Sequence, residues 1–143
     1  MKFTTRGRYG LRAAFVLAQG WGGPPVALKD IAASQHLAEK YLEQLLSALK
    51  KAGLVETVRG AQGGYTLAKP PEEITVRQVV VALEGDMAIV DCQRGAQCKD
   101  ADKCATHKVW NRISDAVNGA LDAITLKDML NDYSCAQARG DRY

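Results

Sequence analysis

The feature that most restricts the fold is a glycine-rich tip between two short β-prone runs, directly after two helical patterns. Residues 54–58 and 65–67 have the β-branched and aromatic composition of strands, and three of the connecting residues 59–64 are glycines. Upstream, residues 27–34 and 38–51 predict helices, the second with leucines at helical spacing on one side. Helix, turn, helix and hairpin in this order predict a winged helix-turn-helix domain.

Local signals predict helices in most of the remaining chain. Thr4 is suited to cap a first helix, which should end at the glycine- and proline-rich loop 20–25. Residues 75–78 have the form of a capping box that opens a further helix. A long helix is expected over about 104–123, and a short last one from Thr125. The predicted fold class is mainly α with a small β-hairpin wing: a winged helix-turn-helix domain plus a long dimerisation helix.

Charge is distributed unevenly along the chain. Residues 1–70 contain ten Lys/Arg and four Asp/Glu, whereas residues 71–143 contain nine and twelve. A basic first half indicates contact with a polyanion, with an ordinary solvated face as the alternative. No apolar run approaches the length of a membrane span, and the first residues lack the apolar stretch of a secretory signal. We therefore expect a cytoplasmic protein without membrane association.

In a winged helix-turn-helix domain, the second helix of the pair enters the major groove of double-stranded DNA. The exposed side of helix 38–51 is therefore the expected base-reading surface, unless it is only the solvated face of a small bundle. Arg59 at the wing suits a narrow, electronegative minor groove, and basic residues of the first helix suit phosphate contacts. The expected DNA-binding residues are Lys2, Arg8, Lys40, Tyr41, Glu43, Gln44, Arg59 and Gly60.

Glu43 is an acid in the middle of a helix expected to face a polyanion. Electrostatics alone would make it lower the affinity for DNA. A carboxylate there can nevertheless accept a hydrogen bond from cytosine N4 and disfavour sites that offer only acceptors. The alternative is a solvent-facing i,i+4 helix partner, but the neighbour one turn back, Glu39, has the same charge and gives little reason for such a pair. We interpret Glu43 as a residue that discriminates between operator sites.

A polar loop and the start of the long helix contain three cysteines and a histidine, Cys92, Cys98, Cys104 and His107. If the long helix begins near Cys104, then Cys104 and His107 share one face of it. Three thiols and an imidazole within sixteen residues predict a metal centre, but spacing alone does not separate zinc from iron–sulfur. Free thiols or a reversible disulfide are the alternatives. Cys135 falls outside the spacing and is expected to be an unliganded thiol.

The long helix also has an apolar stripe with alternating spacings of three and four residues, as in a short coiled coil. Such a stripe predicts a homodimer, although packing within one subunit is the alternative. The expected interface residues are Trp110, Ile113, Val117, Ala120 and Ile124.

Taken together, these motifs resemble the iron–sulfur cluster assembly regulators (the IscR-like group) of bacterial winged-helix transcription factors. The resemblance extends from residue 1 to about 133, and its most specific parts are YLEQL at 41–45, VRGAQGGY at 58–65 and the cysteine–histidine set. It implies a homodimer with one 2Fe–2S cluster per subunit, supplied by the cluster-assembly machinery. The implied cluster ligands are Cys92, Cys98, Cys104 and His107.

Under this resemblance, cluster occupancy changes which promoters are bound and so adjusts cluster-assembly and related genes. Related nitric-oxide and iron sensors take an acidic ligand from the first helix of the partner. Residues 5–9 contain no acid here, which favours His107 and a 2Fe–2S cluster. Sulfur-metabolism members lack the cluster set and are disfavoured. The alternatives are a zinc-stabilised or thiol-redox-switched winged-helix repressor and, more remotely, a redox enzyme.

Four regions follow from this interpretation, and none has the residue pattern of a catalytic site. We therefore expect a DNA-binding regulator and not an enzyme. The regions are a winged helix-turn-helix at 1–84, a cluster-binding loop at 85–104, a dimerisation helix with a C-terminal helix at 105–133, and a flexible tail at 134–143.

Overall fold

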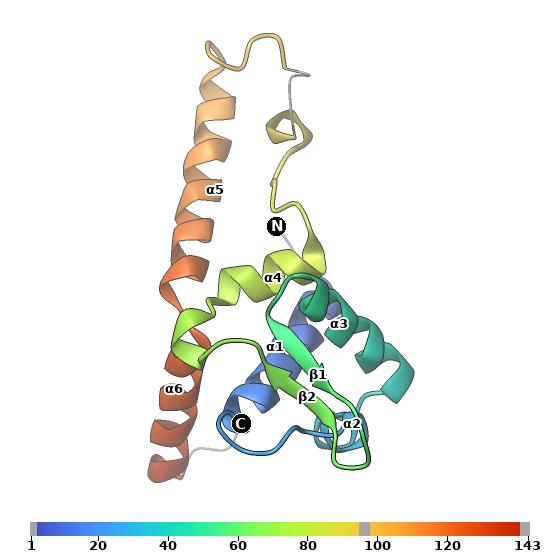
Figure 1. The fold of residues 1–143 in the computed structure, drawn as a ribbon. Coiled ribbons are helices and arrows are strands. Elements are labelled where there is room, and N and C mark those ends of the chain that lie inside the picture. Colours follow the sequence, from blue (N-terminus) through green and yellow to red (C-terminus); the bar gives the residue numbers. More distant parts are fainter. Residues whose placement is uncertain (1–2, 95–97, 141–143) are drawn as a thin grey trace.

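The structure is a computed structural model that describes residues 3–94 and 98–140 (Figure 1). Six α-helices and one two-stranded antiparallel sheet make up most of these residues, which confirms the predicted fold class. The elements are α1 (Thr5–Gln19), α2 (Leu28–Gln35), α3 (Glu39–Lys51), β1 (Val55–Val58), β2 (Gly64–Leu67), α4 (Val76–Glu84), α5 (Ala105–Ala123) and α6 (Leu126–Arg139), with 3₁₀ turns at Pro71–Glu73 and Asp91–Gln93.

Side-chain caps fix the starts of several helices. The Thr4 hydroxyl accepts a hydrogen bond from the Arg6 N–H at the start of α1. The predicted capping box at α4 is present, because Thr75 and Gln78 each accept a backbone N–H from the other. Such caps satisfy donors that have no partner within the helix and define where it begins. Most helix boundaries thus lie within about one residue of those expected.

The core of the winged domain lies where α1, α2, α3 and α4 pack together. The four leucines predicted for the inner face of α3 are completely buried, so the helix presents its polar residues to the outside. This burial removes apolar surface from water and fixes the orientation of α3. The leucines are Leu42, Leu45, Leu46 and Leu49.

The wing is a hairpin in which Val55 pairs with Leu67 and Val58 with Gly64. It is attached to the loop before α2, because Tyr65 and Val26 exchange two backbone hydrogen bonds of 2.8 and 2.9 Å. At Gly64 a Cβ atom would collide with the Val26 backbone. The close approach of these two segments therefore requires glycine at this position.

One expected boundary differs from the structure. The last helix, α6, continues to Arg139, so the predicted flexible tail at 134–143 is helical over its first six residues. Tertiary contacts explain the extension: Ala136 is buried, and the Tyr133 ring meets the Phe15 ring of α1 edge-on at 5.4 Å. The helix ends at Gly140, which adopts the left-handed conformation typical of a helix terminus.

The long helix α5 extends away from the winged domain, and the cysteine loop follows α4 in the same direction (Figure 1). No residue of α5 is buried. Its C-terminal end is attached by two backbone hydrogen bonds, from Val76 N–H to Ile124 O (2.8 Å) and from Leu126 N–H to Ile74 O (2.9 Å). No helix among the described residues is long and apolar enough to cross a membrane.

Candidate functional site

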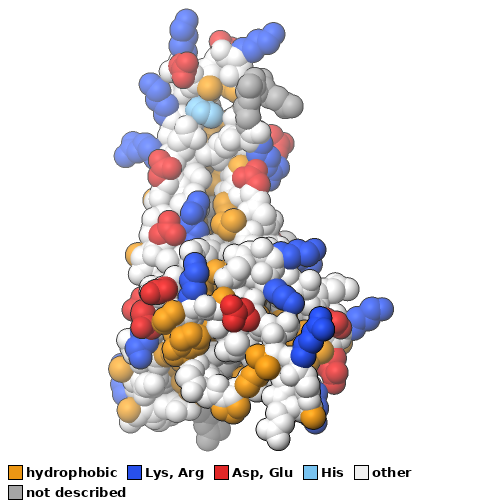
Figure 2. Space-filling model, viewed as in Figure 1, with side chains coloured by type: hydrophobic (Ala, Val, Ile, Leu, Met, Phe, Trp, Pro, Cys, Tyr) orange, Lys and Arg blue, Asp and Glu red, His pale blue; other side chains and the backbone are white. Residues whose placement is uncertain are grey.

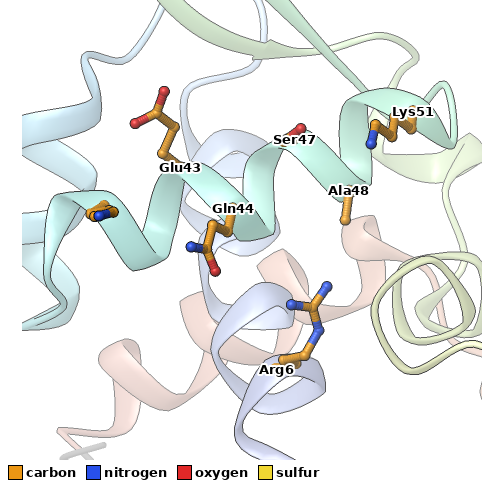
Figure 3. A pocket seen from close by; sticks show the side chains of 7 residues that line it. Arg6, Glu43, Gln44, Ser47, Ala48 and Lys51 are labelled. Carbon is orange, nitrogen blue, oxygen red and sulfur yellow. The ribbon is translucent and has the colours of Figure 1, made fainter.

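The outer face of α3 forms an open groove with α1, of about 550 Å³. Figure 3 shows the Arg6 guanidinium of α1 pointing toward Gln44 and Ala48 of α3, whereas Glu43 points away from Arg6. Exposed Lys, Glu, Gln and Ser side chains on a helix that is firmly anchored behind are suited to contact base edges and phosphates. The lining residues are Arg6, Lys40, Glu43, Gln44, Ser47, Ala48 and Lys51.

The wing lies next to α3 and is connected to it by a side-chain hydrogen bond. Lys50 donates from Nζ to the Thr57 hydroxyl of β1 at 2.9 Å. Arg59 and Gly60 are exposed at the tip, and Gly60 has a φ of 108°, in the region that favours glycine. The candidate DNA-binding residues of α3 and of the wing therefore lie on two connected elements. Lys2, the remaining basic candidate near the N-terminus, lies outside the described residues.

Two other candidate DNA-binding residues, Arg8 and Tyr41, lie at an aromatic pair. Tyr9 of α1 and Tyr41 of α3 contact each other edge-on, with ring centroids 6.4 Å apart. Tyr41 is half-buried, and its hydroxyl lies 3.5 Å from the Thr5 hydroxyl. Arg8 is exposed, with its guanidinium 6.0 Å from the centre of the Tyr9 ring. Arg8 is thus free to reach a phosphate, whereas Tyr41 mainly fixes the start of α3 against α1.

Glu43 influences the wing as well as the groove. The pKa of Tyr65 on β2 is raised, first by its partial burial and second by the negative charge of Glu43. Both effects disfavour the charged phenolate. The electrostatic influence of Glu43 therefore extends to the strand that anchors the hairpin.

Glu84, a residue that sequence analysis did not identify, connects α4 to the start of α1. Its carboxylate accepts hydrogen bonds from the Thr4 N–H and hydroxyl, both at 2.8 Å, and from the Gly7 N–H at 3.0 Å. Arg6 completes the contact by donating from Nε to the Leu83 carbonyl. No local pattern could reveal this contact, because the partners are 77 to 80 positions apart.

The structure brings part of the cysteine–histidine set together. Cys92 Sγ lies 3.5 Å from His107 Nδ1, and Cys104 is the N-cap of α5, with its sulfur accepting the His107 N–H at 3.4 Å. Cys98 is half-buried in the loop and joins none of these contacts. Within residues 3–94 and 98–140, no group of three or more His, Cys, Asp or Glu side chains is close enough to hold a metal ion.

The Cys104 thiol has a lowered pKa. The largest cause is the hydrogen bond with the Thr106 hydroxyl, at 3.1 Å, followed by the hydrogen bond from the His107 backbone. Both interactions favour the thiolate, which is the form that binds metals and reacts with electrophiles. The start of α5 thus supplies one activated sulfur. Cys135 lies apart on α6 and is exposed.

The predicted seam of α5 is partly exposed to solvent. Trp110, Ile113 and Ile124 are 36 to 41% exposed, Ala120 is exposed and Val117 is half-buried. None of the five is buried in the subunit, so the seam stays a predicted dimer interface. Figure 2 shows Lys and Arg side chains, with some Asp and Glu among them, around α3 on the face in view.

Comparison with known proteins identifies the family. A family model described as "Rrf2: Iron-dependent Transcriptional regulator" matches residues 3–132. The chain is 38% identical over 143 residues to the HTH-type transcriptional regulator IscR of Escherichia coli O1:K1 / APEC, covering 100% of this chain and 88% of that protein.

Two solved structures share the fold at comparable identity. IscR of T. potens is 44% identical, with a TM-score of 0.79 over 96% of this chain and 91% of that one. CymR, the global cysteine regulator of B. subtilis, is 42% identical, with a TM-score of 0.77 over 90% and 95%. The helical domain, its hairpin wing and these similarities agree: the chain is a transcriptional regulator and not an enzyme, and it belongs to the Rrf2 family, of the IscR-like type.

Proposed function

We propose that this regulator binds operator DNA as a homodimer and senses iron–sulfur cluster status through a 2Fe–2S cluster, thereby controlling cluster-assembly and related genes. The observation that carries the proposal is the contact between Cys92 and His107, which joins the loop to the helix that also presents the exposed apolar seam. Two of the four ligands at the start of α5 and an apolar surface along the same helix suit a regulator whose cofactor acts through its quaternary arrangement.

For DNA recognition, α3 supplies the major-groove surface and the wing supplies Arg59. The four buried leucines of α3 anchor the helix from behind, and Lys50 holds the wing strand at Thr57. Because the backbone of α3 and of the wing is already in place, binding needs little further ordering of the backbone. Arg8 at the edge of the same domain is placed to contribute affinity without sequence information.

For dimerisation, the exposed residues of α5 would meet the same residues of a second copy. A two-fold interface places the same patch on both subunits, so one apolar stripe is sufficient. Covering Trp110, Ile113 and Ile124 removes their remaining exposed apolar surface from water, and each contributes less than the about 1.5–3 kcal/mol of complete burial because only 36 to 41% is exposed beforehand. The nineteen residues of α5 span roughly 28 Å at 1.5 Å per residue, enough to separate two winged domains along a DNA duplex.

The donor set fits a 2Fe–2S cluster in its chemistry, because such clusters are held mainly by thiolates with histidine as an accepted substitute. Cys92 Sγ contacts His107 Nδ1, Cys104 Sγ accepts the His107 backbone N–H, and Cys98 would complete the set. A bound cluster would supply an iron-dependent crosslink among these four side chains. The cluster-assembly machinery is the natural donor.

Ordering of the cysteine loop would then change how the protein binds DNA. Cys92 and Cys98 belong to the loop that follows α4, and Cys104 and His107 begin α5. Holding these segments together restricts the angle between α4 and α5, and so the relative setting of two winged domains. A preference of about 1.4 kcal/mol for one setting changes the population ratio tenfold, within the usual range of allosteric coupling.

The test is to purify the protein without air and to measure iron, sulfide and visible absorption. We expect about two iron and two sulfide per chain, as a 2Fe–2S centre requires, and loss of colour in Cys92→Ala, Cys98→Ala and Cys104→Ala. The Cys135→Ala variant is the matched control and should keep the colour. Finding stoichiometric zinc and no sulfide would contradict the cluster and indicate a structural zinc site.

A thiol-redox switch is the second candidate, favoured by the similarity to the cysteine regulator CymR. In that case, metal-free protein would show reversible oxidation of two loop cysteines together with a change in DNA affinity. Finding neither metal nor such oxidation would remove both sensing mechanisms and leave only DNA binding.

DNA binding has its own test, which is independent of the cofactor. Arg59→Ala should weaken specific binding by about 1–3 kcal/mol if Arg59 makes a good groove contact. Lys69→Ala, an exposed cation just after the wing, is the control. Equal operator affinity of Arg59→Ala and wild type at matched salt would contradict the wing's role.

A further inference from the structure

The cysteine loop is attached to α5 by a side-chain pair outside the ligand set, Gln93 and Asn111. Resting on the proposed cluster-binding role, we propose that these two amides are positioning residues, which hold Cys92 against His107 before Cys98 closes the site. The pair should hold Cys92 in this position in the cluster-free protein as well.

The Gln93 amide uses both of its ends. Its Oε1 accepts the backbone N–H groups of Ile89 (2.8 Å) and Val90 (3.3 Å), and its Nε2 donates to Asn111 Oδ1 at 3.0 Å. The Gln93 backbone N–H also donates to the Val90 carbonyl at 3.1 Å. One side chain thus closes the turn 89–93 and fastens it to α5.

The two attachment points lie one helical turn apart on α5. His107 and Asn111 are separated by four positions and therefore share a face of the helix. Their partners, Cys92 and Gln93, are adjacent in the 3₁₀ turn Asp91–Gln93. The Cys92–His107 and Gln93–Asn111 contacts together prevent the turn from rotating about α5, whereas the Cys92–His107 contact alone would permit such rotation.

This arrangement matters because the ligands come from separate elements. Cys104 and His107 are held together by the start of α5, whereas Cys92 depends on the loop for its position. Groups that fix a metal ligand from behind commonly alter metal affinity ten- to a hundredfold when removed. A hydrogen bond on an ordinary surface loop would have no such effect.

The first experiment measures Cys92 in cluster-free protein, where no cofactor is involved. Cys98, Cys104 and Cys135 are replaced by Ser, and the alkylation rate of Cys92 by iodoacetamide is followed by mass spectrometry. We expect Gln93→Leu and Asn111→Leu each to react about tenfold faster, because the half-buried Cys92 is released. The matched control is Asn118→Leu. Asn118 lies on α5 like Asn111 and is hydrogen-bonded to Arg77 of α4 and Ser114 of α5, and its variant should react at the starting rate.

The second experiment uses protein with its cysteines intact, reconstituted without air with ferrous iron and sulfide. Loss of visible absorption to excess EDTA should be about tenfold faster in Gln93→Leu and Asn111→Leu, and no faster in the double variant than in Gln93→Leu, because one hydrogen bond is shared. Gln93→Glu should approach the wild-type rate, since its carboxylate accepts both N–H groups and a rotated Asn111 amide can donate to it.

The outcomes separate this inference from the proposed function. Unchanged alkylation and iron loss in both leucine variants would overturn the positioning role, as would a Gln93→Glu variant as fast as Gln93→Leu in iron loss. Wild-type protein that takes up no iron and sulfide would contradict the proposed function. The alkylation rates would still decide whether the amide pair holds Cys92 at His107.

Discussion

The carboxylate of Glu84, the last residue of α4, accepts a hydrogen bond from the backbone N–H of Gly7 in the first turn of α1 at 3.0 Å. A Cβ atom at position 7 would collide with that carboxylate, so glycine permits the approach. The contact gives α1 an acidic cap from a distant element, because its own first turn contains no acid. An acid at a helix N-terminus is favourable both as a hydrogen-bond acceptor and toward the helix dipole.

Replacing Glu84 should therefore destabilise the winged domain. We expect Glu84→Ala to lower the free energy of unfolding by about 1–2 kcal/mol, because three donors at the start of α1 lose a charged acceptor that water replaces only partly. Glu84→Gln, which keeps an acceptor oxygen, should lose less. Urea unfolding of cluster-free protein measures both, and Glu73→Ala on the exposed 3₁₀ turn serves as the control. A Glu84→Ala variant as stable as wild type would mean that this cap is energetically neutral.

Glu43 should set the choice between operators more than the strength of binding. Removing its charge relieves repulsion from phosphates, so Glu43→Ala should bind DNA at least as tightly as wild type. Discrimination between two operator classes should fall, most visibly without cluster. Paired titrations of loaded and cluster-free protein at one salt concentration give the ratio. If the alanine variant keeps the wild-type ratio between the classes, Glu43 is only a surface residue.

The α5 seam should determine the oligomeric state. Ile113→Glu would place an uncompensated charge in an apolar interface, which is costly to desolvate. Light scattering should then report monomers, and affinity for a palindromic site should collapse, while circular dichroism stays unchanged. Asp115→Ala, on the same helix but outside the stripe, is the control. A folded Ile113→Glu variant that remains dimeric would locate the interface elsewhere.

The Cys104 thiol should react at a lower pH than an ordinary cysteine. Its pKa is lowered chiefly by the Thr106 hydroxyl, so a larger fraction is thiolate at pH values between the lowered and the usual pKa. Thr106→Val should move the alkylation profile of Cys104 to higher pH in cluster-free protein that retains this single cysteine. Thr106→Ser should restore the lower-pH profile. Coincident profiles for wild type and Thr106→Val would assign the lowered pKa to another cause.

Much of the fold could be predicted because its determinants are local. The capping box of Thr75 and Gln78 lies within four residues, and the buried leucines of α3 repeat at helical spacing. The end of α6 could not be predicted, because it depends on packing against α1. The hydrogen-bond partners of Glu84 were likewise beyond reach, since only the folded chain brings them together.

The candidate metal site stays a prediction. Residue types and spacing were sufficient to select Cys92, Cys98, Cys104 and His107, and the resemblance named the cluster they would hold. The spacing did not reveal that Cys92 contacts the His107 ring, that Cys104 accepts the His107 backbone N–H, or that Cys98 stays apart. Cys92 and Cys98 both come from the loop after α4, but only Cys92, in the 3₁₀ turn Asp91–Gln93, contacts His107.

The two backbone hydrogen bonds at the base of α5, between Val76 and Ile124 and between Leu126 and Ile74, make this helix a lever with a fixed fulcrum. With a length of roughly 28 Å, a tilt of about 5° displaces its far end by roughly 2.4 Å, whereas the pinned end hardly moves. The cysteine–histidine set is at the far end, where the displacement is greatest. A displacement of the cysteine–histidine set consequently has the greatest effect on the tilt of α5, and so on the angle at which each winged domain meets DNA.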